Sequence, residues 1–169
     1  MDISAADRHK ARQPVIEHYT ELGFNFRMTD IQAAIGLVQL RKVPELTARR
    51  RAMAERYQHL LSGFPELRMI GDPGYGTTNY QSFWILLPDE SPVPRNQMLA
   101  DLAHAGVSAR RGIMAAHLEP AYAGHPHGPL PVTEQLADRS LVLPLFHEMT
   151  EEQQDIVVSA VGAAQSVPA

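Results

Sequence analysis

An amide and a guanidinium stand directly in front of a predicted helix. The stretch "GFNFRMTDIQ" places Asn25 and Arg27 just ahead of Thr29, where the helix is expected to begin. The N–H groups at a helix N-terminus favour an anion and these two side chains would add donors, so the pattern indicates a phosphate site. The structural alternative is that Asn25 completes the turn while Arg27 pairs with Asp30 or another surface carboxylate.

A second group of candidate residues accompanies a predicted strand. Arg110 and Arg111 stand at the strand end in "VSARRGI", and His117 lies in the irregular stretch that follows. Loops on a rigid scaffold can converge on a ligand, so these three side chains are candidates for ligand contacts. Each also has an ordinary structural interpretation. The histidines of "HPH" at 125–127 have too few partners to indicate a metal site.

Other chemical patterns are missing from the sequence. No Ser-His-Asp triad, glycine-rich phosphate loop or His-x-x-x-His pair can be assembled from its residues. The arginine run at 49–51 is interpreted as a solvated helix face with one paired member. Cysteine is absent, which excludes disulfides, thiolate metal sites and cysteine nucleophiles and fits a reducing compartment.

Charge and hydropathy narrow the class of protein further. The net charge of −4 argues against a general nucleic-acid surface. No apolar run approaches the roughly 18 residues of a membrane span, and the start "MDISAADRHKARQ" lacks a signal-peptide core. We therefore expect a cytoplasmic protein with neither a nucleic-acid nor a membrane partner.

A long helix is predicted over residues 29–61. Thr29 and Gln32 form a capping box at its start, and Pro44 indicates a kink or a fresh start within it. Apolar residues follow at helical spacing, namely Ile31, Ile35 and Val38. The small residues between them leave room for another element, so this face is expected to pack against a partner.

Strand-like and helix-like segments alternate after this helix. Strands are expected at 67–70, within "QSFWILLP", at 107–113 and in "LVLPLF", and helices at 94–106, 132–140 and 149–164. Gly106 is the expected stop of the first of these helices, and Thr150 with Gln153 caps the last. Residues 114–130 are expected to form a loop. The fold class is α+β, with a long helix followed by a small antiparallel or mixed sheet packed with helices.

Several blocks of the sequence resemble a known enzyme family in the same order. The blocks are "GFNFRMTDIQAAIGLVQLRKV", "RRRAMAERY", "GVSARRGIMAAHLEPAY" and "LVLPLFHEMTEEQQDIVVSAV", and the resemblance runs from about residue 8 to 164. They are similar to the DegT/DnrJ/StrS family of sugar aminotransferases. Members use pyridoxal 5′-phosphate (PLP) to move an amino group, usually from glutamate, onto a nucleotide-linked keto-sugar.

The resemblance implies a role for each candidate residue. It assigns Asn25 to the PLP phosphate of a neighbouring subunit and Arg27 to the same loop or phosphate. His117 is implied to face the substrate, with Arg110 or Arg111 binding the amino donor's carboxylate or the sugar nucleotide. It also implies three parts: residues 1–28 as the end of the large domain with the phosphate loop, 29–61 as a linking helix, and 62–169 as the small C-terminal domain of a fold-type I PLP enzyme.

The family's covalent anchor has no match in this sequence. Only Lys10 and Lys42 are present, and neither stands in the serine-rich, glycine-flanked context of the lysine that binds PLP in the family. We therefore expect a truncated gene product or cloned fragment that is inactive alone and pairs with itself or with a complementary aminotransferase chain. The alternative is a non-catalytic module that regulates a complete aminotransferase. A DNA-binding regulator is disfavoured by the charge and by the lack of a helix-turn-helix signature.

Overall fold

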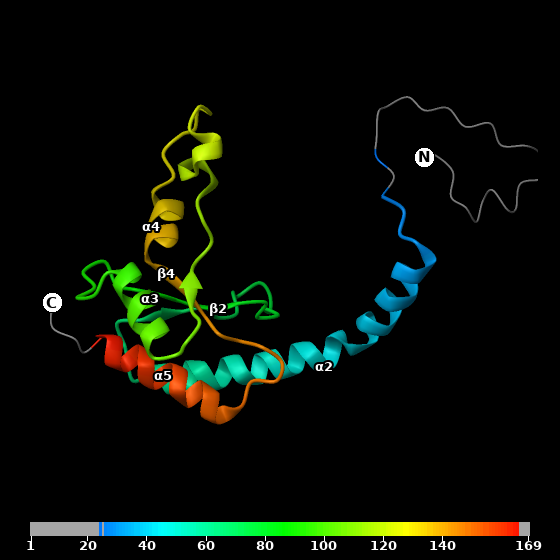
Figure 1. The fold of residues 1–169 in the computed structure, drawn as a ribbon, viewed down its shortest axis with the longest axis horizontal. Helices are drawn as coiled ribbons and strands as arrows, with labels where there is room; N and C mark the ends of the chain where they lie inside the picture. Colours follow the sequence, from blue (N-terminus) through cyan, green and yellow to red (C-terminus); the bar gives the residue numbers. More distant parts are fainter. Residues whose placement is uncertain (1–23, 25, 166–169) are drawn as a thin grey trace, which may run out of the picture. The chain divides into compact units, whose positions relative to one another are not determined.

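The computed structural model describes residue 24 and residues 26–165 (Figure 1). Asn25 lies outside the described residues, as does Lys10. The chain divides into two compact units, Met1–Leu40 and Arg41–Ala169, and each is considered by itself. Helix α2, Asp30–Leu61, contributes residues to both.

The start of α2 follows the predicted cap. The Thr29 N–H donates to Gln32 Oε1 at 2.9 Å, and the Gln32 N–H donates to Thr29 Oγ1 at 3.2 Å, so the capping box is confirmed. Pro44 lies inside the helix, so the fresh start considered for this position is wrong. A proline removes one intrahelical hydrogen bond, and here the turns on either side continue the helix.

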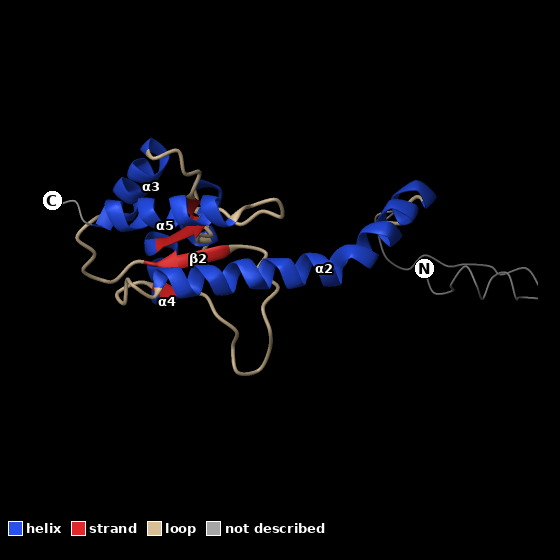
Figure 2. Cartoon of the chain, turned by 90° about the horizontal axis from the view of Figure 1, so that it is seen from below, coloured by secondary structure: helices blue, strands red, loops and turns tan. Residues whose placement is uncertain are grey.

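A four-stranded antiparallel sheet forms the centre of the second unit (Figure 2). Its order is β1-β2-β4-β3, with β1 at Arg68–Met69, β2 at Phe83–Leu86, β4 at Ser140–Leu143 and β3 at Arg110–Arg111. The central pair places Phe83 opposite Leu143 and Ile85 opposite Leu141. The α+β class with a small antiparallel sheet is therefore confirmed.

Three helices cover one face of this sheet. They are the second half of α2, α3 at Arg95–His104 and α5 at Glu151–Gln165, and α3 and α5 lie side by side in both views (Figures 1 and 2). The core between helices and sheet holds fully buried side chains, among them Tyr57, Phe83, Leu102, Leu141 and Val161. Burial of this apolar surface is the main favourable term for folding.

The ends of these helices also follow the sequence. Gly106 takes a φ of 76° just after α3, a conformation that glycine adopts without steric cost, so the predicted stop is confirmed. At α5, the Thr150 N–H donates to Gln153 Oε1 and the Gln153 N–H donates to Thr150 Oγ1, which confirms the second capping box.

The segment between β3 and β4 differs from the expectation in detail. The strand expected at 107–113 is reduced to Arg110–Arg111, because the ladder with β4 pairs these two residues with Val142 and Leu141. The expected loop contains two short 3₁₀ turns, Ala116–Leu118 and Pro120–Tyr122. Helix α4, Pro131–Arg139, follows and leads directly into β4.

A close backbone approach fixes β4 beside the residue after β3. The Gly112 N–H donates to the Ser140 carbonyl at 2.9 Å, and the Ser140 hydroxyl donates to the carbonyl of Leu136 in α4. A Cβ on Gly112 would lie 1.8 Å from Ser140 Oγ and 2.8 Å from Ser140 Cβ. This position therefore has room only for glycine.

We predict that Gly112→Ala lowers the free energy of unfolding by about 1–3 kcal/mol, because β3 must shift away from Ser140. Urea unfolding followed by circular dichroism measures the loss. The matched control is Gly74→Ala, since a Cβ there meets nothing within 4 Å. Equal stability of the two variants would contradict the close approach.

The first unit presents an apolar surface among its described residues. Its exposed large apolar residues are Phe24, Phe26, Met28, Ile31, Ile35, Leu37, Val38 and Leu40. The three residues expected to form a packing face, Ile31, Ile35 and Val38, are thus half or more exposed. Contiguous apolar surface of this kind marks an interaction site or an aggregation risk.

We predict that the purified chain self-associates through this surface. The double variant Ile35→Glu with Val38→Glu should shift the light-scattering mass toward that of a monomer, because it places carboxylates on the apolar face. Val132→Glu serves as the control, since Val132 is an exposed apolar residue of α4 in the second unit. A monodisperse monomer of the unmodified chain at high concentration would overturn the prediction.

Candidate functional site

The sheet has one covered face and one open face. Side chains along a strand point alternately to opposite faces, so Phe83 and Ile85 enter the core while Trp84 between them points to the other side. The pairing of β2 with β4 sets Trp84 opposite Val142, and the pairing of β4 with β3 sets Arg110 opposite Val142. Trp84, Val142 and Arg110 therefore form one row across the open face.

A cavity of ≈ 390 Å³ lies on this open face, and we call it the open-face cavity. Its walls include Trp84 and Val142 from the sheet and Leu136 from α4, with Asn79 and Gln81 from the loop before β2. This size falls within the usual range for small-molecule sites, as does the combination of apolar walls with a few polar groups.

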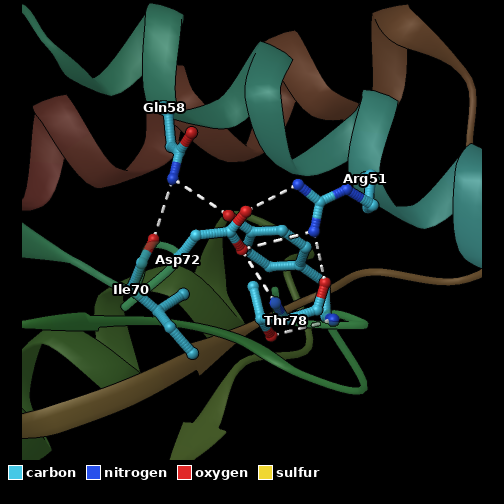
Figure 3. A network of polar contacts seen from close by, with 6 residues as sticks. Arg51, Gln58, Ile70, Asp72 and Thr78 are labelled. Carbon is cyan, nitrogen blue, oxygen red and sulfur yellow. Dashed lines mark hydrogen bonds and ion pairs between the residues drawn. The ribbon is translucent and has the colours of Figure 1, made fainter. Parts of the chain in front are cut away.

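An ion pair between Arg51 of α2 and Asp72 fixes the loop that supplies the polar wall of the open-face cavity (Figure 3). Arg51 reaches from the helix to Asp72 in a bidentate contact, with Nη2–Oδ2 at 2.7 Å and Nη1–Oδ1 at 3.2 Å. Asp72 Oδ1 also accepts the Thr78 N–H at 2.8 Å, and Arg51 Nη1 donates to the Thr78 carbonyl at 2.6 Å. These hydrogen bonds connect the two ends of the loop, Asp72 and Thr78, to each other and to α2.

Tyr80 turns the chain between this loop and β2. Its φ of 47° is uncommon for a residue other than glycine, and its ring is buried. Arg50 Nη1 donates to the carbonyls of Tyr80 and Gln81, both at 3.0 Å, and Gln58 Nε2 donates to the Tyr80 hydroxyl at 3.2 Å. These contacts hold the strained turn, which leaves Asn79 and Gln81 on the cavity wall.

The arginine run at 49–51 is therefore more than a solvated helix face. Arg49 donates to the carbonyl of His147, while Arg50 and Arg51 bind the loop before β2. Arg50 and Arg51 are half-buried. The interpretation that only one of the three arginines is paired is wrong, because each of them donates to a backbone carbonyl. Successive helical positions point about 100° apart, so Arg49 meets a different segment from Arg50 and Arg51.

The pairing of β3 with β4 places Arg110 and Arg111 on opposite faces of the sheet. Arg110 faces the open side with Val142 and lines a second hollow, ≈ 290 Å³, that shares Gln81 and Ser82 with the open-face cavity. Arg111 is opposite the buried Leu141, and its Nη2 lies 3.4 Å from Glu119 Oε1. Of the two arginines proposed from the sequence, Arg110 adjoins the cavity.

His117 occupies a separate position on the segment after β3. Its side chain is 8% exposed, and its Nε2 lies 3.1 Å from Glu134 Oε1 on α4. The carboxylate can only accept, so Nε2 carries the proton of this hydrogen bond. The ring of His127 packs against it with centroids 4.6 Å apart. His117 is absent from the described lining of the open-face cavity.

The predicted phosphate loop belongs to the first unit. Arg27 is exposed just before the cap of α2, and Asn25 lies outside the described residues. The capping box already satisfies the Gln32 N–H, and Asp30 adds a negative charge in the first turn. A phosphate at this position would therefore depend on side chains such as Arg27 more than on the helix end itself.

A family model matches residues 3–162 of this sequence. Its description is the DegT/DnrJ/EryC1/StrS aminotransferase family. The chain belongs to this family. The match spans the cap of α2, the sheet and nearly all of α5, so the resemblance noted from the sequence blocks is confirmed.

Solved structures of aminotransferases share the fold. TlmJ from Streptoalloteichus hindustanus is 34% identical, with a TM-score of 0.74 over 87% of this chain and 39% of that chain. DesI, solved in the presence of its TDP-sugar product, is 29% identical, with a TM-score of 0.73 over 82% of this chain and 36% of that chain. The chain spans about two fifths of the length of these structures.

A more distant structure that shares the fold was solved with PLP. The Escherichia coli GDP-4-keto-6-deoxy-D-mannose-3-dehydratase, with bound hydrated PLP, is 21% identical, with a TM-score of 0.73 over 85% of this chain and 38% of that chain. PLP is bound in that enzyme. Arg27 is chemically suited to its phosphate, because a guanidinium can bind phosphate oxygens through two parallel hydrogen bonds.

The described part of the chain shows neither a metal cluster nor a membrane-spanning helix. Residues 24 and 26–165 contain no group of three or more His, Cys, Asp or Glu side chains placed to hold a metal ion. No helix within the same residues is long and apolar enough to cross a membrane.

The sequence alone did not reveal the open-face cavity. The sequence predicts a strand within "QSFWILLP" and irregular chain before it, and neither pattern indicates that Trp84, Asn79 and Gln81 line a cavity. The alternation around Trp84 in "QSFWILLP" was the available signal, since the residues on either side of it are the buried ones. Which face would remain open depends on the strand pairing, which the sequence does not display.

The free energy of unfolding should decrease in acid because Asp72 becomes protonated. The Arg51 guanidinium and the Thr78 N–H hold the pKa of the Asp72 carboxyl below its ordinary value. The unfolded chain therefore binds this proton at a higher pH than the folded chain. The stabilisation is complete above the ordinary carboxyl pKa, near 4, and is lost as the pH falls through the lowered pKa.

Asp72→Asn should remove this part of the pH dependence and lower the melting temperature at neutral pH. Thermal unfolding between about pH 2 and 7 measures both effects. Asp138→Asn is the matched control, because Asp138 is an exposed carboxylate of α4 away from Arg51. A parallel pH profile for Asp72→Asn and the unmodified chain would show that the ion pair does not stabilise the fold.

Proposed function

We propose that this chain is the C-terminal part of a PLP-dependent aminotransferase that uses glutamate to aminate a nucleotide-linked keto-sugar. The observation that carries the proposal is the family match over nearly the whole chain, joined to a fold shared with TlmJ and DesI. DesI was solved with a TDP-sugar product, which supports a nucleotide-linked substrate. In this role the chain supplies contacts to a site completed by other residues.

The first unit would serve the cofactor phosphate. We assign Asn25 to the phosphate of PLP in a neighbouring subunit and Arg27 to the same phosphate or its loop. Arg27 is exposed and carries a fixed positive charge, as such a contact requires. When bound in the complete enzyme, PLP acts as an electron sink for carbanion chemistry, and the protein supplies its position and surroundings.

The second unit would serve the substrate. Arg110 offers a guanidinium on the open face of the sheet, suited to a carboxylate or a phosphate. Arg111 lies at the edge of the same sheet with Glu119 beside it. His117 keeps a fixed ring orientation through Glu134, so it can present its Nδ1 atom to a substrate group.

Neither lysine of the sequence is proposed to bind PLP covalently. Lys42 is an exposed residue of α2, and Lys10 lies outside the described residues. We predict that borohydride treatment of the purified chain with PLP leaves no stoichiometric pyridoxyl adduct on either lysine by mass spectrometry. Stoichiometric labelling of Lys10 or Lys42 would overturn the proposed division of roles.

A chimaera tests the activity itself. This chain, fused behind the part of TlmJ that it does not match, should bind PLP and lose the PLP absorbance when glutamate is added. Arg110→Gln should weaken substrate use in the chimaera, and Arg68→Gln, at an exposed position of β1, is the control for a lost surface charge. A chimaera that binds PLP and yet gives no response to glutamate would contradict an aminotransferase role and favour a regulatory module.

A further inference from the structure

Two imidazole rings lie in contact on the segment between β3 and β4. This segment extends beyond the sheet and returns to it through α4 (Figure 1). His117 lies in its first 3₁₀ turn and His127 further along it, and their ring centroids are 4.6 Å apart with an interplanar angle of 54°. The side chain of His117 is 8% exposed, whereas His127 is an exposed residue. The packed ring of His127 thus restricts the rotation of the His117 ring.

The hydrogen-bond partner of each ring fixes its tautomer when the ring is neutral. Glu134 Oε1 lies 3.1 Å from His117 Nε2, and an ionised carboxylate can only accept, so Nε2 carries the proton. The carbonyl oxygen of Gly128 lies 2.9 Å from His127 Nδ1 and can likewise only accept. A neutral imidazole carries a single N–H. The remaining nitrogens, Nδ1 of His117 and Nε2 of His127, are therefore acceptors.

The carboxylate of Glu134 is presented from a helix that is itself held in place. The Glu134 N–H donates to the Leu130 carbonyl at 3.0 Å, which places Glu134 in the first turn of α4. Further along α4, Gln135 Nε2 donates to Asp89 Oδ1 at 3.0 Å, and Arg139 forms an ion pair with the same carboxylate. Because Asp89 belongs to the segment between β2 and α3, α4 is attached to a different part of the unit.

A carboxylate beside His117 does more than attach the segment to α4. An amide could either accept from Nε2–H or donate to a bare Nε2, and an apolar contact would select neither tautomer. A carboxylate selects the tautomer with the proton on Nε2, because it can only accept. Carboxylates fix the tautomer of functional histidines in the same way. The contact between Glu134 and His117 therefore has a consequence for the other nitrogen of the ring.

The fixed tautomer also determines which chemical group His117 can take as a partner. A lone pair on Nδ1 accepts a hydrogen bond from a hydroxyl or an amino group. It would oppose the oxygen of an ionised carboxylate or phosphate, since both atoms are acceptors. A neutral His117 held by Glu134 is therefore suited to a hydroxyl of a sugar and not to an anion.

We propose that Glu134 is a positioning residue that holds His117 in the Nε2–H tautomer, so that Nδ1 accepts a hydrogen bond from a sugar hydroxyl of the substrate. His127 assists by restricting the rotation of the ring. This inference rests on the proposed function for the existence of a sugar substrate. Glu134 and His127 both lie between the blocks "GVSARRGIMAAHLEPAY" and "LVLPLFHEMTEEQQDIVVSAV", outside the stretches that carry the family resemblance.

Nuclear magnetic resonance of the chain labelled with ¹⁵N at histidine tests the tautomer directly. Spectra are recorded at about pH 8.5, where an ordinary imidazole is neutral. The double variant Ile35→Glu with Val38→Glu serves as the background, because it limits self-association. We expect a slowly exchanging proton on Nε2 of His117 and none on Nδ1. The signals of this ring are assigned by their loss in His117→Gln.

Substitutions of Glu134 then identify the cause of this signal. Glu134→Ala should lose the Nε2–H signal to exchange with water, and Glu134→Gln should add a population with the proton on Nδ1. Asp138→Asn, an exposed carboxylate of the same helix, is the matched control and should leave the signals of His117 unchanged. Circular dichroism verifies that each variant is folded. A proton on Nδ1 in the unmodified chain, or an unchanged Nε2–H signal in Glu134→Ala, would overturn the inference.

A double-mutant cycle tests whether Glu134 acts through His117. This chain is fused behind the part of DesI that it does not match, and calorimetry measures the affinity for the TDP-sugar product with which DesI was solved. His117→Gln and Glu134→Ala should each raise the dissociation constant about tenfold, as expected for one lost hydrogen bond. Combined, they should raise it no further than His117→Gln alone. Asp138→Asn should leave the affinity unchanged.

The outcomes of the cycle separate this inference from the proposed function. Additive losses in the double variant would overturn the inference, because Glu134 would then act independently of His117. If the TlmJ chimaera responds to glutamate while His117→Gln leaves the affinity for the TDP-sugar unchanged, only this inference fails. If the cycle is non-additive while the TlmJ chimaera is inert, the positioning role of Glu134 remains and the proposed amination fails.

Discussion

The alternation of side chains along β2 and β4 is the constraint on which the rest of the second unit depends. Phe83, Ile85 and Leu141 must point toward the helices, because the apolar core is built from them. A slip of one residue would exchange the two faces and bring Trp84 and Val142 inward. The same energy that fixes the core thus fixes which side chains are presented on the open face.

Local signals explain why much of the fold could be predicted from the sequence. Each capping box joins residues three positions apart, and the glycine stop after α3 acts within one turn. The α+β class follows from the order of periodic segments, which is also a local property. Pro44 was the exception, because whether a helix continues through a proline depends on the turns around it.

The candidate site was less accessible because its contacts join distant residues. Arg51 and Asp72 are 21 positions apart, and the open-face cavity collects residues from the loop between β1 and β2, from β2 and β4, from the segment after β3 and from α4. Nothing in "VSARRGI" indicates that only Arg110 and Arg111 pair with β4, or that they point to opposite sides. These facts belong to the strand register, which the fold as a whole determines.

The rotation of α2 about its own axis determines which segments its three consecutive arginines can reach. Arg49 binds the segment after β4, whereas Arg50 and Arg51 bind the segment before β2. Because the helix advances about 100° per residue, inserting one residue between Arg51 and Met53 would rotate all three guanidinium groups relative to the buried residues that follow, Met53, Ala54 and Tyr57. A residue added ahead of Arg49 would leave this angular relation unchanged, whereas one added between Arg51 and Met53 would not.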